Sequence, residues 1–307
     1  ALTALTSGAN NVAVGYNASK AITTGGGNTS LGESAMVDLV EGTNNTAIGK
    51  GAFGGALDAT ADASTNNVFI GKDSGGGAWV TAVSNFNVAV GNLTMDAAMN
   101  GALQNTAVGH SSLSAITTGD GNVALGAYAG SSLTTGMSNV AVGASDGVTA
   151  GAMRLSTDAD QCVAIGTGSL AAVATQDGTV AVGYKSLAVL TSGARNTAVG
   201  YQASDAITTG ADNTSLGWLA LGTIIDGSQN VAIGSYALAG ALGTTADGSS
   251  NNVAIGYNAA GGGWADQDCS NIIAIGSNAL QGALAGNTAD GSVAVGKSAL
   301  AALTSGA

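Results

Sequence analysis

The chain has 307 residues, of which 45% are hydrophobic, 8% are charged and 4% are aromatic, and its formal net charge is −12. Disordered chains are poor in apolar residues and rich in charge, so this composition indicates a folded protein. Seven Lys and Arg residues argue against nucleic acid or an anionic membrane surface as a partner, because both require basic patches. No apolar run approaches the roughly 18 residues of a membrane span.

A six-residue motif recurs sixteen times, beginning with Asn-Asn-Val-Ala-Val-Gly at Asn10–Gly15. Successive motifs lie 17 residues apart in most cases, and 18 to 23 apart in the others. A fixed period of this length is the signature of a solenoid, in which each repeat stacks on the next. The closing glycines are Gly15, Gly32, Gly49, Gly71, Gly91, Gly109, Gly126, Gly143, Gly166, Gly183, Gly200, Gly217, Gly234, Gly256, Gly276 and Gly296.

Each motif predicts a short strand directly before its glycine, the first over residues 12–14 and the last over 293–295. The position three before the glycine is Val, Ile or Thr, and the position just before it is Val, Ile or Leu. The residue between them is Ala in thirteen copies. This alternation predicts a strand with one branched and one small face, and the glycine permits a tight turn.

A second strand is predicted after each glycine turn, where a small residue is commonly followed by Leu. Turn-forming segments such as Thr-Thr-Gly at Thr23–Gly25 then predict a polar loop. Each repeat, or rung, is therefore expected to run strand, glycine turn, strand, loop. The leucines concerned are Leu113, Leu170, Leu187, Leu221, Leu238, Leu280 and Leu300.

The array contains a longer internal duplication. The glycine intervals 17, 17, 22 and 20 that start at Gly15 return at Gly200, 185 residues later. We therefore expect one continuous all-β array over residues 1–307, with a cassette of residues 1–185 duplicated from about residue 186 onward. A stack of similar rungs can be extended in this way because each rung contacts only its neighbours.

The hexapeptide, repeated in near-register through the whole chain, resembles the head repeats of trimeric autotransporter adhesins, whose motif reads roughly Asn-Ser-Val-Ala-Ile-Gly. The segment NTAVGYQA at Asn196–Ala203 also resembles repeats in bacteriophage and algal-virus tail fibres. The resemblance implies a left-handed parallel β-roll, three copies around one axis and a role in adhesion.

Asparagine occupies the position four before the glycine in twelve copies, including Asn11, Asn28, Asn45 and Asn67. Asparagine favours turns, and asparagines stacked at one per rung can also form an amide ladder. Aromatic residues directly follow five of the motif glycines, and their rings are predicted to line one edge. They either contact a glycan or another surface, or cover the edge and pack between chains. These residues are Tyr16, Tyr184, Tyr201, Trp218 and Tyr257.

Other candidate sites favour structural roles. His110 occupies a variable exposed position, and one unsupported histidine supplies no catalytic set. Cys162 and Cys269 lack a disulfide or metal spacing, and the glycine runs 25–27, 75–77 and 261–263 lack a phosphate-loop ending. Trp79 and Trp264 are expected to plug matching loops. The loop acids Asp58, Asp62, Asp247 and Asp290 lack the spacing of known calcium loops, so we expect no metal, cofactor or enzymatic activity.

We therefore expect a non-enzymatic extracellular fibre or attachment protein, at a cell or virion surface, whose partners are itself and a glycan or protein receptor. Two alternatives remain: a filament or sheath subunit without a receptor, and an ice-binding solenoid. The chain opens with ALTALTSGA and closes with ALAALTSGA, at the same phase of the repeat. This predicts either an excerpt of a longer fibre or head-to-tail stacking of subunits.

Overall fold

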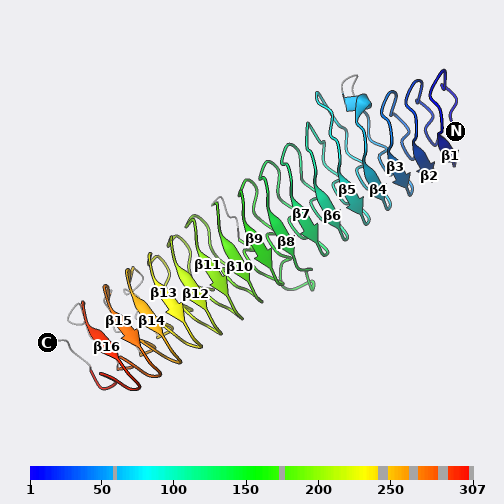
Figure 1. Ribbon diagram of the computed structural model, residues 1–307. Helices are drawn as coiled ribbons and strands as arrows, with labels where there is room; N and C mark the ends of the chain where they lie inside the picture. The colour runs from blue at the N-terminus through cyan, green and yellow to red at the C-terminus, as the bar shows by residue number, and fades with distance from the viewer. Residues whose placement is uncertain (58–60, 173–176, 241–247, 263–268, 283–289, 304–307) are drawn as a thin grey trace. The chain divides into compact units, whose positions relative to one another are not determined.

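The computed structural model describes residues 1–57, 61–172, 177–240, 248–262, 269–282 and 290–303. The chain divides into two compact units, Ala1–Asp160 and Gln161–Ala307. Each unit is an all-β parallel solenoid in which every rung contributes one strand to a single sheet (Figure 1). The predicted solenoid of about sixteen rungs is confirmed, while its left hand and its three-chain assembly stay predictions.

The described residues form sixteen strands of three residues each, and every one ends just before a motif glycine. A short 3-10 helix, η1 (Ala61–Ala63), lies in the loop after the third rung. In the first unit the strands are β1 (Val12–Val14), β2 (Thr29–Leu31), β3 (Thr46–Ile48), β4 (Val68–Ile70), β5 (Val88–Val90), β6 (Thr106–Val108), β7 (Val123–Leu125) and β8 (Val140–Val142). In the second unit they are β9 (Val163–Ile165), β10 (Val180–Val182), β11 (Thr197–Val199), β12 (Thr214–Leu216), β13 (Val231–Ile233), β14 (Val253–Ile255), β15 (Ile273–Ile275) and β16 (Val293–Val295).

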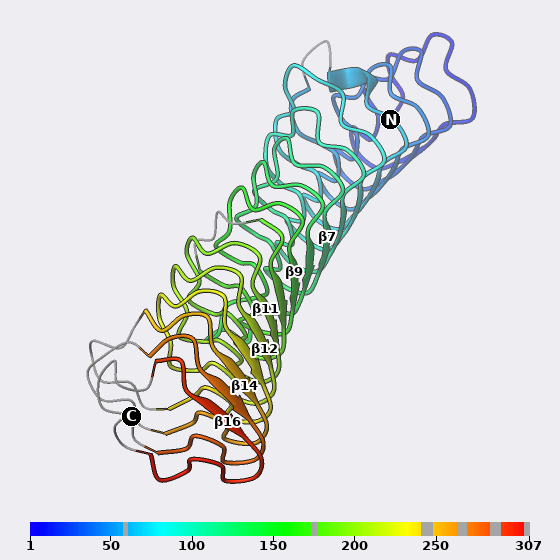
Figure 2. The same cartoon turned by 60° about the vertical axis from the view of Figure 1, so that its left-hand side comes forward.

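Consecutive strands within each unit pair in parallel and in one constant register. In the second unit, for example, Thr197 faces Thr214 and Val199 faces Leu216. Figure 2 shows these strands forming one wall of each coil, with the loops on the far side. Equivalent residues of successive rungs therefore lie directly above one another, about 4.8 Å apart.

The predicted second strand is wrong. The seven leucines assigned to it have φ between 46° and 56°, in the left-handed region. In the rung of Leu113, Ser111 is also left-handed, with φ 52°, so two such residues with one between them bend the chain sharply. The N–H of Leu113 still donates to the carbonyl of Ala129 in the next rung, at 3.0 Å. The segment is a stacked corner, and alternation of small and large residues does not distinguish it from a strand.

The small face of each strand points into the coil. From β2 to β16 the middle residue is buried, while its two branched neighbours are partly or fully exposed. Large core side chains come instead from the corners and loops, among them Ile22, Leu39, Met95 and Leu113. The left-handed backbone of the corner leucines costs roughly 1–2 kcal/mol each. Burial of a leucine side chain offsets this cost with about 2 kcal/mol.

Serine replaces the middle alanine in two strands, and in both cases a second serine satisfies it. The hydroxyl of Ser19 donates to that of Ser30 at 2.8 Å, and Ser204 donates to Ser215 at the same distance. Both pairs are buried. A buried hydroxyl without a partner would be costly, so each pair keeps the narrow interior free of unpaired groups at these rungs.

One rung inverts the usual distribution of volume. Phe69 stands in β4 where other strands have Ala or Ser, and Gly75 stands at the corner where the next rung has Met95. A Cβ on Gly75 would lie 2.6 Å from the Phe69 ring. The ring packs instead against Phe53 and the buried Trp79, with centroids 5.1 and 5.6 Å away. The side chain of the strand residue and that of the corner residue therefore compete for the same space inside the coil.

We predict that Phe69→Ala and Gly75→Met are each destabilising but compensate one another. The first opens a cavity and costs about 3–5 kcal/mol. The second drives a side chain into the Phe69 ring, although its backbone fits, because Met95 adopts the same left-handed conformation with φ 49°. The double variant rebuilds the Ala89/Met95 arrangement of the next rung. Urea unfolding should give a favourable coupling of at least about 2 kcal/mol.

A double variant whose loss in unfolding free energy equals the sum of the two single losses would contradict this shared volume. Ala89→Phe supplies the reverse control, because it adds a ring to a rung whose corner already holds Met95. We expect this variant to be strongly destabilised unless Met95→Gly accompanies it, since overpacking of a filled core costs typically 1–3 kcal/mol or more.

Candidate functional site

Two rows of branched side chains cover the outer face of the sheet in each unit. They are the first and third residues of every strand, and they are Val, Ile, Leu or Thr throughout. Near the middle of the first unit, Val123 is 41% exposed and Leu125 is 49% exposed. None of the sixteen described strands contains a charged residue. The face is consequently a flat, uncharged and largely apolar surface.

The motif glycines form a column at the edge of this face. Their φ angles lie between 121° and 156°, a region that disfavours any residue with a side chain. A Cβ on Gly200 would also overlap the carbonyl group of Gly217 in the next rung. The N–H of Gly200 donates to the carbonyl of Val182 at 2.8 Å, which holds the two rungs close together. Glycine is therefore needed twice at this position, for the φ of the turn and for the close contact between rungs.

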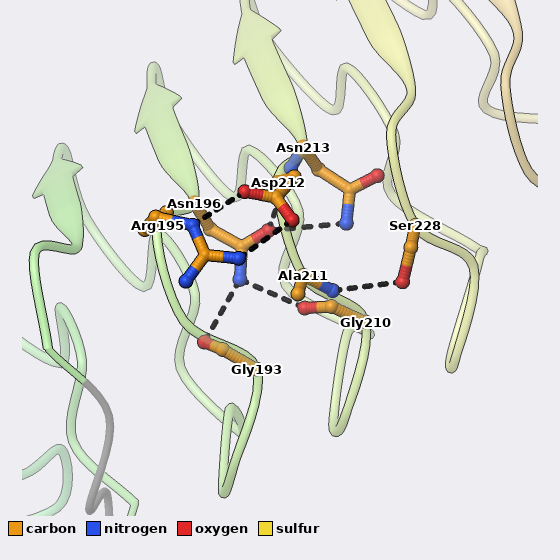
Figure 3. A network of polar contacts seen from close by, with 8 residues as sticks. All are labelled: Gly193, Arg195, Asn196, Gly210, Ala211, Asp212, Asn213 and Ser228. Carbon is orange, nitrogen blue, oxygen red and sulfur yellow. Dashed lines mark hydrogen bonds and ion pairs between the residues drawn. The ribbon is translucent and has the colours of Figure 1, made fainter.

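The motif asparagines form a buried amide ladder along the inside of each coil. In the second unit, the amide oxygen of Asn196 accepts the backbone N–H and the side-chain N–H of Asn213, both at 3.0 Å. The amide nitrogen of Asn213 donates to the carbonyl of Gly227 at 2.8 Å. Figure 3 shows the Asn196–Asn213 step. In the first unit the ladder runs without interruption through Asn11, Asn28, Asn45, Asn67, Asn87, Asn105, Asn122 and Asn139.

An exposed ion pair lies beside this ladder and was not anticipated from the sequence. Arg195 donates to both carboxylate oxygens of Asp212, from Nε at 2.7 Å and from an η nitrogen at 2.9 Å (Figure 3). The hydrogen bond from Arg195 lowers the pKa of Asp212. Both residues directly precede a ladder asparagine, so they occupy the same position in successive repeats. Opposite charges at one position of successive repeats could therefore have predicted this ion pair from the sequence. Exposed pairs of this kind add little stability.

Aromatic side chains gather along the edge beyond the glycines in the second unit. The rings of Tyr184 and Tyr201 stack with centroids 5.2 Å apart and an interplanar angle of 22°. Trp218 instead packs against Tyr236, at 4.8 Å and 60°. Tyr236 is not among the aromatic residues predicted from the sequence, because it lies two residues after its glycine. Between Tyr201 and Trp218, each 50% exposed, lies a hollow of about 380 Å³.

The remaining two aromatic candidates stand outside this hollow. Tyr257 is 57% exposed in the second unit, and Tyr16 is 74% exposed in the first. In the first unit His110 forms an edge-on contact with Tyr128, at 5.3 Å between centroids. The guanidinium of Arg154 lies 5.2 Å from the centre of the same tyrosine ring. His110, which is exposed, therefore belongs to a small cluster with the partly buried Tyr128 and Arg154.

Charged groups near the aromatic edge are held by local contacts. The amine of Lys185 lies 5.4 Å from the centre of the Tyr184 ring. The side-chain amide of Gln202, next to Tyr201, donates to Asp205 at 2.9 Å. Burial raises the pKa of Asp205. A partly buried carboxylate held by Gln202 therefore lies within four residues of Tyr201 in the chain.

Several sequence candidates lie elsewhere or outside the described residues. Trp79 is buried in the aromatic cluster around Phe69, and Cys162 and Cys269 are also buried. The carboxylate of Asp290 accepts the N–H of Ser270 at 2.7 Å, and Asp62 belongs to η1. Asp58, Asp247, Gly263 and Trp264 lie outside the described residues.

Two features of the described part of the chain concern metals and membranes. Within it, no group of three His, Cys, Asp or Glu side chains is arranged to hold a metal ion. It also contains no helix with the length and apolar character needed to cross a bilayer.

A comparison with models of known protein families and a comparison with curated proteins both give no match to this chain. The resemblance to adhesin and tail-fibre repeats therefore rests on the motif alone.

We predict that Thr179→Asn stabilises the second unit by about 1–2 kcal/mol in chemical unfolding. Thr179 occupies a ladder position directly before Asn196, and its hydroxyl is buried with no hydrogen-bond partner among the described residues. An amide there would accept the N–H of Asn196. It would also donate to the carbonyl of Gly193, which now accepts the Asn196 amide at 3.0 Å.

The matched control is Asn213→Thr, which creates a similar break in the middle of the ladder. It should cost about 1–3 kcal/mol, because it leaves the N–H of Asn230 and the carbonyl of Gly227 without their amide partners. If both variants unfold at the same urea concentration as the parent, the ladder does not contribute to stability.

Proposed function

We propose that this chain is a non-enzymatic structural and attachment protein that forms part of an extended extracellular fibre, at a cell or virion surface. Three parallel copies associate through the outer faces of their sheets. The observation that carries the proposal is the pair of uncharged aliphatic rows on that face. The number three comes from the resemblance of the motif to adhesin head repeats.

The apolar outer face of the sheet is larger than the apolar patches that soluble monomers usually expose, and this supports its burial against another chain. A soluble monomer rarely exposes a contiguous apolar patch of more than a few hundred Å². Here the exposed residues include Val14, Leu31, Val123 and Leu125 in the first unit, each 41–55% exposed. Constant register keeps the rows straight, so the rows of an identical chain can follow them over many rungs. Association of identical surfaces around a closed axis is the commonest form of soluble oligomer.

The internal structure of each unit fits a load-bearing fibre. Every rung donates backbone hydrogen bonds to its neighbour, as in Val88 to Asn105 at 2.8 Å and Gly109 to Val90 at 2.8 Å. The amide ladder adds buried side-chain bonds along the same direction. Local opening of one rung would leave several buried polar groups unsatisfied at once, and each such group costs about 1–3 kcal/mol.

The threonines of the structure bear on the ice-binding alternative. The sheet face carries Thr29, Thr46, Thr106, Thr197 and Thr214, but never more than two in successive rungs. In the loop pairs, the Thr117 hydroxyl donates to the Thr134 carbonyl at 3.0 Å along the stack, whereas the adjacent Thr118 and Thr135 are exposed. Among the described residues, neither set forms the unbroken outward row that this alternative requires, and this supports the choice of attachment over ice binding.

We predict that the purified chain sediments as a trimer of three 29.0 kDa subunits, and that Val123→Glu/Leu125→Glu dissociates it. Both substitutions place a carboxylate on the outer face, where association would bury it without a partner. Sedimentation velocity at micromolar concentration measures the change, and circular dichroism shows whether the coil is retained.

Thr118→Glu/Thr135→Glu is the matched control, because it adds the same charge at two exposed loop positions of the first unit. This variant should remain trimeric. A parent protein that sediments as a 29.0 kDa monomer at all accessible concentrations would exclude the proposed association through the sheet face.

A further inference from the structure

We propose that the hollow between Tyr201 and Trp218 binds a pyranose ring of an uncharged saccharide by stacking. The inference rests on the proposed attachment function and names the ligand class for one site of it. The two rings belong to successive rungs, as the pairing of Val199 with Leu216 in β11 and β12 shows.

The hollow exists because its two rings lean on different neighbours. Rungs are about 4.8 Å apart, which is too close for two parallel rings to admit a ligand between them. Tyr201 stacks toward the preceding rung, on Tyr184. Trp218 packs toward the following rung, on Tyr236. The two rings thus separate, and an aromatic neighbour supports each from behind. A site held open in this way loses little conformational entropy on binding.

The lining of the hollow matches the surface chemistry of a sugar. Tyr201 and Trp218 are each half exposed, so their ring faces are accessible. The faces of aromatic rings are electron-rich, and the aliphatic C–H face of a pyranose carries the complementary partial charge. The Tyr201 hydroxyl and the Trp218 N–H lie at the rims of these rings and can bond sugar hydroxyls. The hollow is shallow and open to solvent, so it suits contact with the face of one sugar ring and not enclosure of a whole ligand.

Charge favours an uncharged saccharide over an acidic one. The chain carries a net charge of −12, which repels polyanions over the whole surface. Asp205, which accepts a hydrogen bond from Gln202 beside Tyr201, adds a local carboxylate. Lys185 lies over the ring of Tyr184 and not over the two rings that line the hollow. Among the described residues, Tyr201 and Trp218 line the hollow, and neither supplies the cationic partner that a sialic or uronic acid requires.

The test measures binding of the full chain to an array of neutral and acidic glycans, followed by titration calorimetry with the strongest neutral oligosaccharide. We expect weak binding, with a Kd on the order of 1 mM for one site, because two rings supply the whole contact. Trp218→Ala and Tyr201→Ala should each weaken binding by about tenfold, since an aromatic stacking contact contributes roughly that much. Trp218→Leu, which keeps apolar volume and removes the π face, should have a similar effect.

Tyr16→Ala is the matched control. Tyr16 occupies the same position after its glycine and is 74% exposed, but it belongs to the first unit and does not line the hollow. Its substitution should leave affinity unchanged. Circular dichroism and sedimentation of every variant show that folding and assembly are retained.

The outcomes separate the site from the general function. If the parent binds cells or glycans and Trp218→Ala binds equally well, the hollow is excluded and attachment stands. Binding only to acidic glycans overturns the ligand class. A changed sedimentation coefficient for Trp218→Ala assigns the hollow to contact between copies and overturns the inference. If the parent binds neither cells nor any glycan, the attachment function itself fails, and the sedimentation of the trimer still tests the fibre.

Discussion

The structure depends on the backbone hydrogen bonds that join each rung to the next at constant register. Within a unit, the N–H of Val88 donates to Asn105 and that of Val123 to Asn139, both at 2.8 Å, and the other motifs repeat this pattern. A rung spacing of about 4.8 Å follows from these bonds. At that spacing, equivalent residues are always in contact, and a residue type suits a position only if it can tolerate a neighbour directly above it. Glycine at the turn and asparagine in the ladder both satisfy this condition.

The same constraint decides which side chains face outward. A coil of 17 residues with three-residue strands encloses a narrow interior, so in most rungs the strand contributes Ala to it and the corner contributes Leu or Met. The exchange of volume between Phe69 and Gly75 shows how little space remains. Branched aliphatic residues, which favour strands, are therefore displaced to the outer face. The apolar surface on which the proposed association depends is thus a consequence of the small cross-section of the coil.

Much of the fold could be predicted from the sequence because the repeat is nearly exact. Val-Ala-Val before Gly15 indicates a strand, and sixteen copies indicate a stack. Period-two alternation does not say which face is buried, however, and here the face with larger side chains is outside. The corner leucines were misassigned because Ser112-Leu113 has the composition of a strand, while the left-handed φ of Ser111 and Leu113 depends on contacts from neighbouring rungs. Tyr236 escaped notice because it is one residue out of phase with the other aromatic residues.

The sheet face and the aromatic edge can serve different partners at the same time, because a single glycine in each rung separates the two surfaces. In the rung of β11, Val199 belongs to the outer row, Gly200 turns the chain with φ 141°, and Tyr201 follows beyond the turn. A partner that covers the row of Val199 approaches along the sheet, whereas Tyr201 lies past its edge. The glycine that permits close stacking of rungs thus also separates a surface suited to self-association from one suited to a ligand. Each added rung extends both surfaces together, so a duplicated cassette would lengthen the proposed fibre and supply further positions for aromatic residues.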